Sequence, residues 1–171
     1  TTRHSGELGV QRDADMLWLD FPAQSAEPLD APVPELAAGL NIQPEQVFAG
    51  PNYLAVFEQE SDIAKLTPDM RALAKLPDRC VIATAPADGP ELDFVSRFFA
   101  PNYGVDEDPV TGSAHCMLAP YWGQRLNKTT LNARQISKRG GNLRCELAGE
   151  RVRISGRAVL YLEGEIRLSL E

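Results

Sequence analysis

The fold is decided by the stretch Asp-Pro-Val-Thr-Gly-Ser-Ala-His-Cys, residues 108–116, and by the apolar run that continues from it to Leu126. An acidic triplet and a proline-fixed turn lead into small residues, a pattern that predicts a helix start with accessible backbone N–H groups. Such a helix end carries partial positive charge and suits a carboxylate or another anion. Asp108 would lie at the rim of that site. A carboxylate beside an anion site is typical of an enzyme that moves protons on an acidic substrate.

The helix predicted over residues 114–126 is apolar in nearly all directions rather than along one stripe, which indicates a buried helix. Predicted strands precede and follow it, and glycine turns separate most of those that follow, as in an antiparallel meander. We therefore predict an α+β fold in which an antiparallel, barrel-like sheet wraps around a central buried helix. Pro120 falls inside this helix and should kink it or remove one hydrogen bond.

The remaining elements follow from periodicity and turn residues. The proline-rich stretch 22–34 is typical of a linker or an irregular crossing. Helices are predicted at 34–40, 61–66 and 67–76, the last with proline at its first position. Strands are predicted at 8–10, 16–21, 47–49, 53–57, 80–85, 93–99, 131–137, 143–147, 152–154, 158–162 and 166–170.

Length and net charge limit the number of domains and the classes of binding partner that we expect. The 171 residues fit one domain. A formal net charge of −7 argues against nucleic acid, because phosphate binding needs clustered Lys and Arg. There is no run of eighteen apolar residues, so we expect no membrane-spanning segment and no membrane partner, and there is no signal-peptide pattern at the N-terminus. The odd number of widely spaced cysteines favours a reducing cytoplasm. The chain begins with Thr1 rather than Met, and we expect it to be a piece of a longer protein.

Cysteine and histidine usage argues against a metal site and against a disulfide framework. The three cysteines, Cys80, Cys116 and Cys145, are odd in number and widely spaced, and only two histidines are present. We expect all three thiols to be unpaired and free of metal. The sequence also carries no nucleophile elbow, phosphate loop or dinucleotide fingerprint.

The 108–115 run, together with Pro120-Tyr121-Trp122, resembles the phenazine-biosynthesis PhzF-like family, whose members are relatives of diaminopimelate epimerase. The resemblance covers essentially the whole chain and implies that it is the second half of a two-domain protein. Residues 1–22 would be the passage from the missing first half, and residues 23–171 a C-terminal epimerase-like domain. Three further segments resemble the family: Ser5-Gly6-Glu7-Leu8 with Leu19-Asp20-Phe21-Pro22, Gly50-Pro51-Asn52 with the strand after it, and Gln135-Ile136-Ser137-Lys138-Arg139-Gly140-Gly141.

The resemblance implies an isomerase that needs no cofactor and shifts a proton between carbons of a small carboxylate-bearing substrate. Its base, a glutamate, would lie in the missing half. This chain would supply one wall of the cleft, and alone it should bind substrate weakly and turn over nothing. Asp108 is the catalytic candidate, and Thr111, Gly112, Ser113 and His115 are the substrate-binding candidates. The expected partners are the substrate and the missing N-terminal half, and a homodimer stays open.

Each candidate also has a structural interpretation. Asp108 suits a turn opener, and Thr111, Gly112 and Ser113 suit an ordinary helix start. His115 is favoured slightly as a buried, hydrogen-bonded core residue.

Nearby residues are not assigned to the site. Cys116 is predicted as core, because thiol-type members of this fold carry the thiol at the head of the helix, where Thr111-Gly112 stands here. Asp106 and Glu107 are predicted to be solvated charges, and Arg139-Gly140-Gly141 a turn.

A hypothesis from another class is that the chain is a binding or dimerisation module of the same fold. Many strands and an acidic surface are compatible with it. A small carboxylate seated on the amides of Gly112 and Ser113 would favour the enzyme. An empty helix end beside a large two-fold interface would favour assembly.

Overall fold

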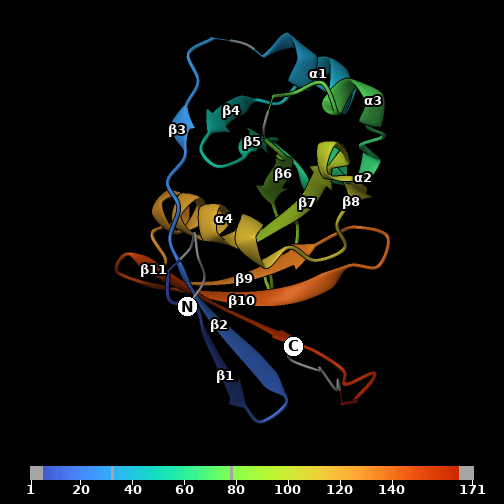
Figure 1. The fold of residues 1–171 in the computed structure, drawn as a ribbon. Helices are drawn as coiled ribbons and strands as arrows, with labels where there is room; N and C mark the ends of the chain where they lie inside the picture. Colours follow the sequence, from blue (N-terminus) through green and yellow to red (C-terminus); the bar gives the residue numbers. More distant parts are fainter. Residues whose placement is uncertain (1–5, 32, 78, 166–171) are drawn as a thin grey trace.

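A computed structural model describes residues 6–31, 33–77 and 79–165 (Figure 1). The helices are α1 (Pro34–Leu40), α2 (Glu60–Lys65), α3 (Met70–Leu73) and α4 (Gly112–Leu126), with a 3-10 turn, η1, at Pro101–Tyr103. No helix of the described residues is long and apolar enough to cross a membrane. The strands are β1 (Gly9–Asp13), β2 (Met16–Pro22), β3 (Glu27–Pro28), β4 (Gln46–Ala49), β5 (Tyr53–Val56), β6 (Val81–Pro86), β7 (Phe94–Ala100), β8 (Val105–Glu107), β9 (Thr130–Gln135), β10 (Gly141–Ala148) and β11 (Arg151–Arg157).

All the strands belong to one large sheet. Its order is β1-β2-β11-β10-β9-β7-β6-β5-β4-β3, and β8 pairs with β7 off this path. Among the described residues β1 and β3 are the two ends of the path and do not pair with each other, so the sheet is open (Figure 1). The architecture is mixed α/β with an open sheet, where the sequence predicted a barrel-like one.

Two strand pairs are parallel, although the sequence predicted an antiparallel sheet. β5 runs parallel to β6, and β7 runs parallel to β9. Parallel neighbours need a crossover connection, and helices supply it in both cases. α2 and α3 join β5 to β6, and α4 lies on the connection from β7 to β9. The helices were predicted at these places, but their consequence for strand direction was missed.

Alternate residues of β5, β6 and β7 face two separate hydrophobic clusters, as the period-two geometry of a strand requires. Leu54, Ile82 and Phe94 pack with α4 and with residues of β9, β10 and β11. Ala55 and Val95 point to the other face, where they pack with α1, α2 and α3. This part of the sheet is therefore covered by helices on both faces, with α4 on the face opposite α1–α3 (Figure 1).

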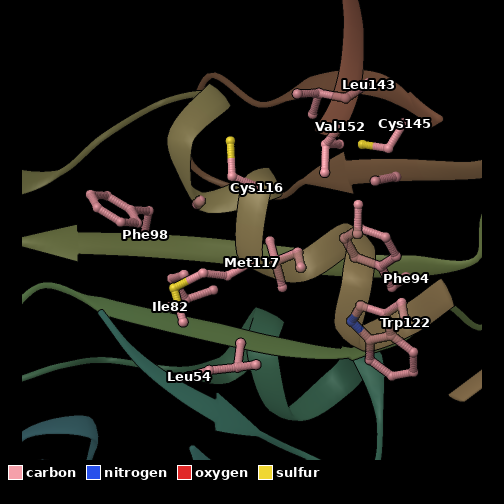
Figure 2. Packing of buried hydrophobic residues seen from close by; sticks show 14 of the residues in the cluster. Leu54, Ile82, Phe94, Phe98, Cys116, Met117, Trp122, Leu143, Cys145 and Val152 are labelled. Carbon is pink, nitrogen blue, oxygen red and sulfur yellow. The ribbon is translucent and has the colours of Figure 1, made fainter. Parts of the chain in front are cut away.

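Most of α4 is buried, as its apolar composition predicted, although Ser113 and the last turn are exposed. Figure 2 shows Met117 directed towards Ile82 and Cys116 directed towards the side of Leu143. Pro120 removes one helical hydrogen bond, as predicted, because it has no N–H to offer the Cys116 carbonyl. The backbone N–H of Gln24, from the proline-rich crossing, bonds that carbonyl instead at 2.9 Å.

The end of the chain differs from the sequence prediction. The expected strand at 158–162 is not formed, since residues 158–165 have no regular secondary structure, and the expected strand at 166–170 lies outside the described residues. The side chains of Val159, Leu160, Tyr161 and Leu162 are between 79% and 97% exposed. A strand forms only where a neighbouring strand offers backbone partners, and no described strand pairs with this segment.

Candidate functional site

The site begins at the N-terminus of α4, where Thr111 is the N-cap. The first N–H groups of any helix lack an intrahelical carbonyl, so those of Gly112 and Ser113 point out of the helix end. The first turn contains no acidic side chain, and Gly112 adds no bulk. This end of a 15-residue helix therefore presents donors and partial positive charge to whatever binds beside it.

Asp108 lies next to this helix end. Its backbone N–H donates to the Phe98 carbonyl at 3.0 Å, which ties the loop to β7. Its carboxylate oxygen Oδ2 accepts the hydroxyl hydrogen of Thr111. The half-buried Asp108 and the exposed Ser113 line one hollow of about 380 Å³. The rest of its lining is largely apolar and comprises Pro51, Asn52, Cys80, Phe98, Ala100, Tyr103 and Val105.

The other predicted substrate contacts are not brought into that hollow. Thr111 is buried, and its N–H and its hydroxyl hydrogen are both bonded inside the protein, to Gln135 and to Asp108. Gly112 lines a second, larger hollow of about 990 Å³, together with Gly140 and Gly141. The helix end thus lies between two hollows, with Ser113 in one and Gly112 in the other.

His115 is fully buried and packs near the Phe94 ring, with 5.9 Å between ring centroids. Its Nδ1 donates to the Thr111 carbonyl at 2.8 Å, because a carbonyl oxygen can only accept. Burial lowers the pKa of His115 to about 4, so the ring is neutral at physiological pH. Its Nε2 has no hydrogen-bond partner among the described residues. This placement matches the structural interpretation of His115 better than substrate contact.

Glu107 is not a solvated charge, and that prediction was wrong. Arg97 holds it in a two-pronged ion pair, with Nε at 2.7 Å from Oε1 and a terminal nitrogen at 2.9 Å from Oε2. The same guanidinium donates to the carbonyls of Ile63 and Leu66 at the end of α2. The ion pair anchors β8, one residue before Asp108, to β7 and to α2. Asp106 is exposed, as predicted.

All three thiols are free and buried. Cys116 belongs to the hydrophobic cluster around α4, which confirms its interpretation as core. Burial raises the pKa of Cys116 to about 11 and that of Cys145 to about 12, so both thiols are protonated at physiological pH. Cys80 is the thiol that borders the hollow, and burial raises its pKa too. Within the described residues no three His, Cys, Asp or Glu side chains cluster closely enough to hold a metal ion.

Sequence reasoning missed several residues of this region. Asn52, Phe98 and Tyr103 line the hollow, the first from the turn before β5 and the other two from β7 and η1, which precede α4. The Gly50-Pro51-Asn52 motif was a usable signal, but it was interpreted only as the approach to a strand. Gln135, whose side chain is bonded to the Asp108–Thr111 loop, belongs to a motif that was assigned no role.

Comparison with known proteins identifies the family to which the chain belongs. A family model described as phenazine biosynthesis-like protein, PhzC-PhzF, matches residues 12–164. The chain belongs to this family, which confirms the resemblance inferred from the sequence. It is 54% identical over 166 residues to an uncharacterized isomerase of Pseudomonas aeruginosa, a match that covers 96% of this chain and 62% of the relative. A second uncharacterized isomerase of the same organism is 51% identical over 164 residues, with the same coverage of both chains.

Solved structures of the family share the fold. The crystal structure of a PhzF-family protein from Enterococcus faecalis is similar with a TM-score of 0.86 and 44% identity, over 94% of this chain and 61% of that one. A putative PhzC/PhzF protein from Clostridium difficile is similar with a TM-score of 0.82 and 36% identity, with the same coverage. The chain therefore spans about three fifths of the length of these relatives.

Proposed function

We propose that the chain supplies one wall of the active site of a cofactor-independent isomerase, which moves a proton between carbons of a small carboxylate-bearing substrate. The proposal is supported by membership of the PhzF-like family and by relatives that are named isomerases. The observation that carries it is local. Asp108, a half-buried carboxylate, and Ser113, in the first turn of α4, line the same hollow.

In this proposal the N–H groups of the first turn of α4 hold an anionic group of the substrate, and the helix end stabilises the enolate-like charge that develops when a carbon loses its proton. Asp108 hydrogen-bonds the substrate or assists the proton transfer. The catalytic glutamate and the opposite wall would come from the part of the full-length protein that this chain lacks. We therefore propose that this chain alone turns over nothing.

The test is proton exchange by the full-length protein. The protein is incubated in D2O with a panel of small carboxylic acids that carry a proton on the carbon next to a carbonyl or a double bond. Deuterium uptake is then read by NMR and mass spectrometry. The proposal expects uptake at one carbon of at least one acid, with no added metal or cofactor. No uptake from any acid of the panel would count against it.

A second candidate is a binding module, favoured by one observation. Four consecutive large apolar side chains, Val159 to Leu162, are exposed at the end of the described chain. Large apolar patches on a protein surface often mark interaction sites. Sedimentation analysis of the full-length protein tests this candidate. If the protein self-associates, Leu160→Glu abolishes the self-association and no acid of the panel is deuterated, assembly is favoured over catalysis.

A further inference from the structure

The motif Gln135-Ile136-Ser137, at the end of β9, reaches the loop that carries Asp108. Gln135 is wholly buried, and its Nε2 donates to the Asp108 carbonyl at 2.6 Å. Ser137, two residues further on, donates through Oγ to the Pro109 carbonyl at 2.7 Å. This one segment therefore holds two successive carbonyls of the loop.

The orientation of the Gln135 amide is fixed by its partners. Its Oε1 accepts the backbone N–H of Thr111 at 2.8 Å, and its Nε2 faces the Asp108 carbonyl. A backbone N–H can only donate and a carbonyl can only accept, so exchanging the amide oxygen and nitrogen would break both bonds. The donor nitrogen of Gln135 therefore lies on the side of Asp108.

That orientation also sets the direction of the Thr111 hydroxyl. The Nε2 of Gln135 donates to Thr111 Oγ1 at 3.2 Å, and this nitrogen cannot accept a hydrogen in return. The hydroxyl hydrogen must point elsewhere, and it is donated to Oδ2 of Asp108. The result is a directed chain of donors from Gln135 through Thr111 to Asp108. The other carboxylate oxygen, Oδ1, has no hydrogen bond among the described residues.

We propose that Gln135 is a positioning residue for Asp108, acting through the Thr111 hydroxyl. It holds one carboxylate oxygen of Asp108 and leaves the second for the substrate. The inference rests on the proposed function, because it assigns a task to the same carboxylate. The rival interpretation is that Gln135 only satisfies buried backbone groups of the loop, in which case removing it would lower stability but not the rate per folded molecule.

The first arm of the test is structural and needs no substrate. Crystal structures of the full-length protein are determined for Gln135→Met, Thr111→Val and, as the matched control, Ser137→Ala. We expect the Asp108 carboxylate to leave its position, or to split into two conformers, in the first two variants and to stay in place in the control. An Asp108 side chain that is unmoved in Gln135→Met overturns the proposal. If that variant does not fold, Gln135→Glu keeps the side-chain shape but removes donor hydrogens, and the same criterion applies.

The second arm is kinetic and uses an acid that the wild-type full-length protein deuterates. Gln135→Met and Thr111→Val should each lower kcat by about 10-fold to 10²-fold while KM stays within about twofold, because the carboxylate is misplaced rather than removed. The double variant should lose no more than either single one, since both break the same chain of donors. Ser137→Ala should keep kcat within about twofold, even with a lowered Tm.

The outcomes separate the two proposals. A wild-type protein that deuterates no acid contradicts the proposed function, and the crystal structures alone then decide whether Gln135 positions Asp108. Losses of kcat that multiply in the double variant, or an equal loss in Ser137→Ala, show general support of the loop and overturn the positioning role. Unchanged kcat in Gln135→Met, with Asp108 displaced in the crystal, overturns it as well.

Discussion

Acidification should destabilise this protein through His115. The side chain is fully buried, and burial lowers the pKa in the folded state to about 4, whereas an unfolded histidine titrates near 6.5. Below pH 6.5 the unfolded chain therefore binds a proton at His115, whereas the folded chain does not bind it until the pH approaches about 4. The stability that the neutral ring provides is complete above pH 6.5, falls as the pH drops towards about 4, and falls no further below that. A difference of about 2.5 pKa units corresponds to about 3 kcal/mol over the whole window, and to about 2 kcal/mol between pH 6.5 and 5.

The assay is urea unfolding of the wild type and of His115→Leu at several pH values between 7.5 and 5. The variant loses the bond to the Thr111 carbonyl and should be less stable at pH 7.5, but its own pH dependence should be flatter. Subtracting the two curves removes the contribution of carboxylates and other groups common to both proteins. The free-energy difference between wild type and variant should therefore shrink by about 2 kcal/mol towards pH 5. Parallel curves over this range would show that His115 is not held neutral by burial.

Two substitutions and one measurement of thiol reactivity test other parts of the structure. Arg97→Met should lower the free energy of unfolding, measured by urea unfolding, by about 3 kcal/mol, because it leaves the half-buried Glu107 without its ion-pair partner and removes the donors to the Ile63 and Leu66 carbonyls. A loss below about 1 kcal/mol would show that Arg97 does not anchor β8. Gly123→Ala should cost about 1–3 kcal/mol and lower Tm, since a Cβ would come within 2.4 Å of Leu147 Cδ1 and 2.9 Å of the Lys128 carbonyl. The control is Gly89→Ala, where a Cβ has open space and φ is not positive, and it should leave Tm unchanged. Cys116 should react with a thiol reagent at pH 8 on the order of 10²-fold more slowly in the folded protein than in urea, because burial raises its pKa to about 11. Equal rates in the two states would contradict the burial of this thiol.

Local sequence patterns were sufficient for most elements of the fold. Pro34 to Leu40 was predicted as a helix and is α1, because proline at the first turn and periodic leucines are signals that neighbours do not override. The all-round apolar surface of α4 also predicted its burial. The direction of strand pairing was not accessible from periodicity, since β5 and β9 have the same alternation whether their neighbours run parallel or antiparallel.

The candidate site shows the same division between local and long-range information. Asp108 and Ser113 were found because they flank one helix start in the sequence. Gln135 is 27 residues from Asp108, so nothing local indicated its bond to that loop. Glu107 was misjudged for a different reason: Arg97 is only ten residues away, but the pairing of β7 with β8 that brings them together was not predicted.

If Asp108 takes part in proton transfer, replacing it must slow the exchange of a substrate proton in the full-length protein. Deuterium exchange into the acid found by the panel is measured for the full-length protein, for Asp108→Asn, and for Asp106→Asn as a neighbouring exposed control. Asp108→Asn should lower the exchange rate by on the order of 10²-fold or more, with little change in stability, while Asp106→Asn should keep the wild-type rate. An Asp108→Asn protein that unfolds more easily, yet exchanges at the wild-type rate per folded molecule, would make Asp108 a structural cap with no part in proton transfer.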